Sequence, residues 1–379
     1  MIGSMRDPRL GKLAEVLVNY SVAVGKDQLV RLSAPEVATP LVNELYRQVL
    51  AAGGQPMVRM GTEEMQEIFF KNAGDAQLRY VNPVTKYEVE TIDCSIGIWA
   101  EANTKALTGC DPKRMATAAA ARQAISDIFL RRAAEGRLKW SGTQFPCQAS
   151  AQDADMSLAE YEDFVFGAGL LDHPQPIEAW KQVSLRQQRL VDFLNGKSDY
   201  HVVAANGTDI RMSVAGRRWI NCDGHENFPD GEVFTGPVLD SVQGVVHFSF
   251  PAVYHGREVH GVRLRFKAGK VVDASAEKGE DYLISMLDMD GGSRFLGECA
   301  VGTNFNIKRY TRNTLFDEKI GGTVHLALGA GYPETGNDNH SGLHWDMVVD
   351  LRSGGYIEID GQRVSEDGKF TREEWPGIG

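Results

Sequence analysis

The sequence predicts an α/β N-terminal domain with a mostly parallel sheet, followed by a β-rich α+β C-terminal domain. In the first half, segments with a helical hydrophobic period alternate with short apolar strands, which is typical of a parallel sheet covered by helices. After Gly196 the segments become rich in Val, Ile and Phe and are separated by Gly, Asn and Asp, as in β structure. Because a chain of 379 residues exceeds the size at which a single core usually stops growing, we expect two domains, residues 1–195 and 196–379.

Capping residues, prolines and glycines mark the ends of the expected elements. In the first half, one helix starts at Thr62 and other helices are expected over residues 10–22, 36–50, 112–132, 158–166 and 177–195. Strands of this half are expected over residues 28–32, 56–60, 88–99 and 138–145. In the second half, strands are expected over residues 242–250 and 262–267, and two more flank a polar loop within residues 322–351. The glycines of the first half lack the spacing of a phosphate-binding loop, so no nucleotide cofactor is expected.

The overall charge limits the kinds of partner. A formal net charge of -11 argues against nucleic acid and against anionic membranes, because binding phosphates needs a basic patch. No run approaches the roughly 18 apolar residues of a membrane span, and the first residues lack the pattern of a secretory signal. Five scattered cysteines without a Cys-x-x-Cys pair fit reduced thiols. We therefore expect a cytoplasmic protein.

The pair His344-x-Asp346 stands out among the polar residues of the second half. Residues two apart in a strand share a face, so the imidazole and the carboxylate point one way while Trp345 and Met347 point into the core. Both groups bind zinc and similar metals, and the strand fixes their separation. This spacing predicts a metal site.

His325 lies in an apolar run that resembles a buried strand. A lone buried histidine is more often a core residue bonded to a backbone carbonyl, but the His-x-Asp pair about 20 residues downstream favours a metal ligand. Glu232 and Glu298 each lie beside glycines that permit tight turns or close approach. Taken alone, each of these two glutamates is more often a surface residue beside a turn, and composition does not argue against that interpretation.

Four segments resemble the aminopeptidase T family, the thermophilic-type metallo-aminopeptidases also called M29 peptidases. These segments are residues 227–237, 296–304, 317–327 and 332–351. The motifs Pro-Asp-Gly-Glu-Val-Phe, Leu-Gly-Glu, His-x-Ala-x-Gly and His-x-Asp occur in the family's order and with similar spacing. The similarity extends along almost the whole chain. It implies two adjacent divalent metal ions held by Glu232, Glu298, His325, His344 and Asp346.

The resemblance also implies an activity, the hydrolysis of N-terminal residues from peptides by a water that two metals activate. Glu298 would bridge the metals, and Glu318 and Tyr332 match an acidic position and a tyrosine near the family's metal centre. Glu318 is expected to act as the general base, and Tyr332 is expected to donate a hydrogen bond to the oxyanion. Zinc or cobalt, and also manganese or magnesium, suit such ligands. The relatives imply a homodimer that acts on peptides with a free N-terminus.

Two rival functions use the same sequence features. One is a metallohydrolase of another amide, such as an acylated amino acid, and the other is a binding protein that retains the fold without the chemistry. Sequence does not separate the first rival from an aminopeptidase. The second would be favoured by a missing ligand, and all five expected ligands are present.

Overall fold

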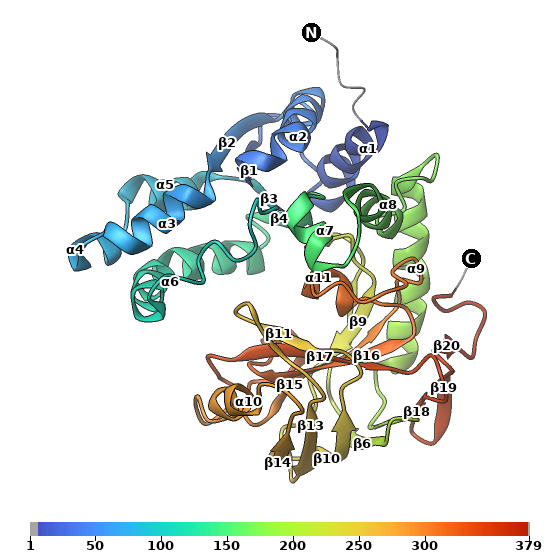
Figure 1. Cartoon of the computed structure of the whole chain (residues 1–379). Coiled ribbons are helices and arrows are strands. Elements are labelled where there is room, and N and C mark those ends of the chain that lie inside the picture. Colours follow the sequence, from blue (N-terminus) through green and yellow to red (C-terminus); the bar gives the residue numbers. More distant parts are fainter. Residues whose placement is uncertain (1–6, 378–379) are drawn as a thin grey trace. The chain divides into compact units, whose positions relative to one another are not determined.

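The computed structural model describes residues 7–377, and the chain divides into two compact units (Figure 1). Unit 1 comprises Met1–Ile177 and Gly224–Pro229, and unit 2 comprises Glu178–Asp223 and Asp230–Gly379. The units divide the chain at the start of a long helix rather than at its end. The domain boundary expected after residue 195 stays a prediction about independent folding.

Unit 1 is built on a five-stranded parallel sheet with the strand order β2-β1-β3-β4-β8. Its strands are β1 (Leu29–Pro35), β2 (Gln55–Gly61), β3 (Cys94–Trp99), β4 (Lys139–Gln144) and the short β8 (Asn227–Phe228). In β1 the residues alternate between buried and half-buried, with Val30 and Leu32 fully buried, because one face packs on helices. The predicted α/β fold with a parallel sheet is confirmed.

The helices of unit 1 begin at the signals that the sequence contains. They are α1 (Pro8–Val16), which continues as a π-helical turn η1 (Leu17–Ser21), then the 3-10 turn η2 (Glu36–Ala38), α2 (Thr39–Ala51), α3 (Glu63–Asn72), α4 (Asp75–Leu78), α5 (Pro83–Thr91), α6 (Pro112–Ala134), α7 (Gln148–Asp153) and α8 (Leu158–Ala168). Thr62 caps α3 by accepting a hydrogen bond from the Met65 N–H.

The expected strand over residues 88–99 is wrong in its first part. Residues up to Thr91 end helix α5, and the strand starts only at Cys94. Asn82 caps this helix by accepting from the Val84 N–H, and Pro83 occupies the first helical position. This Asn-Pro start outweighs the β-favouring residues that follow.

Unit 2 contains the long helix α9 (Pro176–Leu194), which begins at the end of unit 1, and two antiparallel sheets. One sheet has the order β14-β13-β10-β6-β5-β18-β19-β20 and the other has the order β17-β16-β15-β9-β7. The first consists of β5 (Asp199–Ala204), β6 (Thr208–Ser213), β10 (Gln243–His247), β13 (Arg263–Lys267), β14 (Lys270–Ser275), β18 (Tyr356–Ile359), β19 (Gln362–Glu366) and β20 (Lys369–Phe370). The second consists of β7 (Ile220–Cys222), β9 (Glu232–Thr235), β15 (Leu296–Gly302), β16 (Thr323–Gly329) and β17 (His344–Asp350).

Both sheets contribute to one hydrophobic core, which includes Val202 and Leu264 from the first sheet and Leu326 and Trp345 from the second. Smaller elements complete the unit: the hairpin β11 (Ala252–Tyr254) and β12 (Arg257–Val259), the helices α10 (Glu280–Leu287) and α11 (Thr314–Asp317), and the 3-10 turn η3 (Pro333–Thr335). The predicted β-rich second half is confirmed. Within residues 7–377, no helix combines the length and the apolar character that a membrane span requires.

Candidate metal centre

The five residues predicted as metal ligands gather on neighbouring strands of the second sheet of unit 2. Glu232 starts β9, Glu298 lies on β15, His325 lies on β16, and His344 and Asp346 lie on β17. These strands are consecutive neighbours in the sheet, so residues far apart in sequence meet on one face. The opposite face of β17 carries Trp345, Met347 and Val349, which are buried in the core as the alternation predicts.

A β-bulge turns Glu298 toward this face. Leu296 pairs with Leu328 and Glu298 pairs with the adjacent Ala327, so Gly297 is an extra residue in β15. Leu296 points into the core, as do Cys299 and Val301 on the other side of the bulge. In a regular strand Glu298 would share the face of Leu296 and would be buried in the core. The bulge therefore places the carboxylate in the site.

Both histidines are oriented by backbone carbonyls. His325 Nδ1 lies 3.0 Å from the Glu318 carbonyl oxygen, and His344 Nδ1 lies 3.0 Å from the Ala330 carbonyl oxygen. Because a carbonyl oxygen only accepts, each Nδ1–H donates, and each ring turns Nε2 toward the carboxylates. This is the arrangement that metal-binding imidazoles adopt.

Glu298 offers one carboxylate oxygen to each imidazole. Its Oε1 lies 2.9 Å from His325 Nε2, and its Oε2 lies 3.6 Å from His344 Nε2. The Asp346 Oδ1 atom lies 3.8 Å from His325 Nε2 and 3.6 Å from His344 Nε2. Two lone pairs that face each other at such distances need a proton or a cation between them.

The residues fit divalent ions on their donor chemistry and on their unsatisfied atoms. Glu232 Oε2 and Asp346 Oδ1 are buried and find no hydrogen-bond partner among the described residues. Three of the four sets of donor atoms that converge closely enough to hold an ion consist of His and carboxylate groups alone: Glu232 with Glu298 and His325, Glu298 with His344 and Asp346, and Glu318 with His325 and Asp346. Glu298 belongs to two of these sets, so its two oxygens can serve two adjacent ions.

Burial and mutual charge shift the titration of the cluster. Burial raises the pKa of Glu232 to about 8, against the opposing effect of Lys319, and burial also raises the pKa of Glu298. Burial alone would lower the pKa of His325, but its hydrogen bond to Glu298 and the charges of Glu232, Glu298 and Asp346 raise it to about 10. Without a cation, the cluster therefore retains protons that a metal ion would displace.

The two residues expected to act on substrate also lie in the cluster. Glu318 follows α11 and belongs to the set with His325 and Asp346. Tyr332 is 38% exposed, and its ring meets His344 edge-on with centroids 5.3 Å apart. Burial, then the charges of Glu298 and Asp346, raise the pKa of the Tyr332 phenol, which keeps its proton available for donation. A small cavity of about 20 Å³ lies beside Glu318 and Asp346 and is lined in part by Pro251 and Val253.

Sequence reasoning missed Lys319, whose side chain is fully buried against this cluster. Its Nζ lies 3.5 Å from Glu232 Oε1 and 3.8 Å from Asp230 Oδ1, and it contacts the Glu318 carboxylate directly. The sequence signal was weak, because one lysine directly after two acidic residues normally indicates a surface turn.

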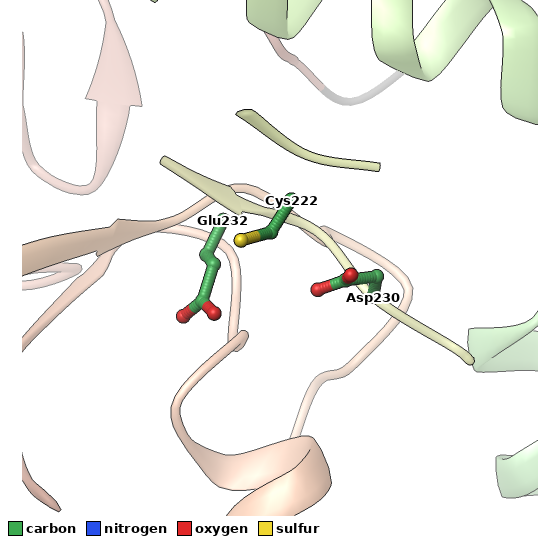
Figure 2. Close-up of side chains that lie close together, drawn as sticks. All are labelled: Cys222, Asp230 and Glu232. Atoms are coloured by element: carbon green, nitrogen blue, oxygen red, sulfur yellow. The ribbon is translucent and has the colours of Figure 1, made fainter. Parts of the chain in front are cut away.

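Cys222 lies next to the same acidic pair. Figure 2 shows its Sγ beside the carboxylates of Asp230 and Glu232, and the three ligand atoms lie within 4.8 Å of one another. Burial, then the charges of Asp230 and Glu232, raise the pKa of the Cys222 thiol well above its ordinary range. A protonated thiol is a poor metal ligand, and the cation already present at these carboxylates is the Lys319 ammonium.

Known proteins resemble this chain along nearly its whole length. The family model described as thermophilic metalloprotease (M29) matches residues 6–370. Aminopeptidase 2 of Geobacillus stearothermophilus is 31% identical, and the alignment covers 96% of this chain and 95% of that protein. Aminopeptidase T of Thermus thermophilus is 29% identical, with 96% of each chain covered.

Two solved structures share the fold of this chain. Wild-type AmpT from Thermus thermophilus superposes with a TM-score of 0.85 at 25% identity, covering 96% of this chain and 99% of that chain. A 2,5-dihydroxypyridine dioxygenase from Pseudomonas putida superposes with a TM-score of 0.60 at 13% identity, covering 96% of this chain and 98% of that chain. At that identity the second likeness concerns the fold alone.

Proposed function

This chain belongs to the M29 family of thermophilic metalloproteases and is a metallo-aminopeptidase, and from that premise we propose that it removes N-terminal residues from peptides through a two-metal centre. The observation that carries the two-metal proposal is the position of Glu298, with one oxygen facing each imidazole. The unsatisfied oxygens of Glu232 and Asp346 lie on either side and support it.

In the proposed mechanism, Glu232, Glu298, His325, His344 and Asp346 hold the ions. When bound, such ions polarise the scissile carbonyl and lower the pKa of a water molecule. Glu318 accepts the proton of the attacking water and returns it to the leaving amine. The Tyr332 hydroxyl donates a hydrogen bond to the oxyanion that develops on the carbonyl. The acidic surroundings attract the protonated α-amine of the peptide.

The proposal extends to the identity of the metal, the cellular compartment and the oligomeric state. The mixed set of imidazoles and carboxylates accepts zinc, cobalt, manganese or magnesium, so metal supply selects among them. All five cysteines are free thiols, which supports a reducing compartment, and we place the protein in the cytoplasm. We also propose a homodimer.

The deciding experiment combines metal content with substrate specificity. The wild-type protein should bind two divalent ions per chain by mass spectrometry of metals and should release the first residue of free peptides but not of N-acetylated ones. Glu298→Gln preserves the shape of the side chain but removes its charge, so it should lose metal and at least about 100-fold in kcat/KM. Glu366→Gln, an exposed carboxylate on β19, is the matched control and should behave as the wild type does.

The rival functions give different results in the same experiment. Hydrolysis of N-acetylated amino acids in preference to free peptides would identify a hydrolase of another amide. Bound metal without hydrolysis of either class would identify a binding protein. Full activity of Glu298→Gln would exclude the proposed centre.

A further inference from the structure

Lys319 is a fully buried lysine beside the candidate ligands, and the proposed mechanism gives it no role. Burying an ammonium group is unfavourable unless carboxylates surround it. Here three carboxylates do so, those of Asp230, Glu232 and Glu318. A methionine or leucine would fill the same space without that requirement, so the charge itself needs an explanation.

Glu232 contacts both this ammonium and the candidate metal centre. Its Oε1 lies 3.5 Å from Lys319 Nζ, while its Oε2 lies 3.6 Å from His325 Nδ1 and lacks a hydrogen-bond partner among the described residues. One oxygen is thus held by an internal cation and the other remains for a metal ion. Glu318 is held by the same ammonium, which fixes the proposed proton acceptor.

The two sides of the centre differ in their contact with this cation. The set formed by Glu232, Glu298 and His325 includes a carboxylate that Lys319 partly neutralises. The set formed by Glu298, His344 and Asp346 makes no ion pair with a lysine or an arginine within residues 7–377. A divalent ion at Glu232 is repelled by the ammonium that contacts the same carboxylate, whereas neither His344 nor Asp346 pairs with Lys319.

The total charge of the cluster matches two divalent ions together with the Lys319 ammonium. When ionised, Asp230, Glu232, Glu298, Glu318 and Asp346 carry five negative charges, and Lys319 supplies one positive charge. The remaining four negative charges are those that two divalent cations balance. A third divalent ion beside Cys222 and Asp230 would occupy the place that the ammonium already fills.

We propose that Lys319 is a positioning residue that acts as a permanent internal cation: it holds Glu232 and Glu318 in place and makes the ion at Glu232 the weaker and more exchangeable of the two. The inference rests on the proposed two-metal function. It assigns the tighter ion to Glu298, His344 and Asp346. Lys319 also keeps the acidic cluster folded when that weaker ion is absent, because its charge remains when the ion leaves.

A titration of the metal-free protein with Mn²⁺ tests the proposal. Isothermal calorimetry of the wild type should resolve two sites whose Kd values differ by about tenfold or more. Lys319→Met keeps the length of the side chain and removes its charge, so the weaker site should tighten by about tenfold or more while the tighter site changes little. Lys319→Arg retains the charge and should leave the weaker site weak.

Lys319→Met can fail to fold without metal, so a second variant is needed. The double variant Lys319→Met/Asp230→Asn removes one charge of each sign and so leaves fewer buried charges without a partner. Because Asp230 is not among the proposed ligands, its weaker site should still tighten, though by less than in Lys319→Met. Unchanged Kd values in a folded Lys319→Met or double variant, or an equal weakening of both sites, would overturn the role of Lys319. Failure of the wild type to bind two ions would instead overturn the two-metal function on which the inference rests.

Discussion

Glu298 is the residue on which the proposed two-metal centre most depends. Its two oxygens face imidazole nitrogens whose other ring nitrogens already donate to backbone carbonyls. In the metal-free protein a proton must occupy such a contact, which agrees with the raised pKa of His325, caused by its hydrogen bond to Glu298 and the nearby carboxylates. Metal and proton therefore compete for the same atoms.

The first prediction concerns the pH dependence of the metal-free protein. Burial raises the pKa of Glu232 and of Asp317 to about 8, and the pKa of His325 rises to about 10, in each case above the unfolded value. The folded state then binds more protons than the unfolded state, so these groups stabilise it at low pH. That stability is lost as the pH rises from about 5 to about 10, by about 1.4 kcal/mol per pH unit for each proton.

Urea denaturation at pH 6, 7.5 and 9 in the presence of a chelator measures this loss. Glu232→Gln should flatten the decline between pH 5 and 8, because its amide does not titrate. Excess Mn²⁺ should also flatten it, because bound metal displaces the protons. A metal-free wild type whose unfolding free energy rises over this range would contradict the assigned pKa shifts.

The second prediction concerns Tyr332. Tyr332→Phe keeps the ring that packs edge-on against His344 and Phe234 but removes the hydroxyl. We expect kcat to fall on the order of 100-fold while metal content and KM change little, because the lost hydrogen bond is made to the oxyanion. Steady-state kinetics together with metal analysis measures this. A loss of metal, or a rise in KM alone, would show that Tyr332 acts in binding instead.

At the scale of elements, the bulge in β15 decides which face Glu298 occupies. A Cβ atom at Gly297 would lie 2.0 Å from the Ala330 carbonyl oxygen, closer than any real contact, so only glycine fits. The strand on either side is fully buried and cannot shift freely. The close approach of the Ala330 carbonyl thus explains why the Leu-Gly-Glu motif contains a glycine.

The third prediction follows from that close approach. Gly297→Ala should destabilise the protein by about 2–4 kcal/mol and should weaken metal binding, because β15 must move away from residue 330 and takes Glu298 with it. Gly291→Ala, where an added Cβ meets nothing within 4 Å, is the matched control and should change neither property. Thermal denaturation and Mn²⁺ titration of both variants measure the effect. A fully stable, metal-binding Gly297→Ala protein would show that the bulge is not required.

Local signals in the sequence predicted the elements better than the contacts between them. Prolines, caps and alternation predicted the helices α1, α2, α3, α6, α8 and α9 but missed most of the short strands of unit 2. The alternation in β17 correctly separated the face of His344 and Asp346 from the core. The pairing of the two-residue strand β8 with β4 could not be predicted, because it joins residues far apart in sequence. The bulge at Gly297 and the burial of Lys319 depend on register between strands, which a single sequence does not reveal.

At the scale of the whole molecule, exposed apolar side chains are concentrated in unit 1. Helix α3 has no fully buried residue, although it contains Met65, Ile68 and two phenylalanines, and Met65 and Ile68 are more than half exposed. Val58 and Met60 on the edge strand β2 and Tyr87 on α5 are exposed as well. A helix normally buries its apolar stripe, so we propose that the exposed side chains of α3 lie in a protein interface.

The fourth prediction assigns the proposed homodimer to this surface. A charge introduced there would be buried without a partner on association, so Ile68→Asp on α3 should convert the dimer to a monomer in light scattering coupled to size exclusion. Leu185→Asp changes an equally exposed apolar residue of α9 in unit 2 and should leave the dimer intact. If Ile68→Asp remains dimeric while Leu185→Asp dissociates, the interface belongs to unit 2. Because α3 has no buried residue, dissociation should also increase the rate of amide hydrogen exchange in this helix. Such an increase would show that the dimer, rather than the single chain, stabilises α3.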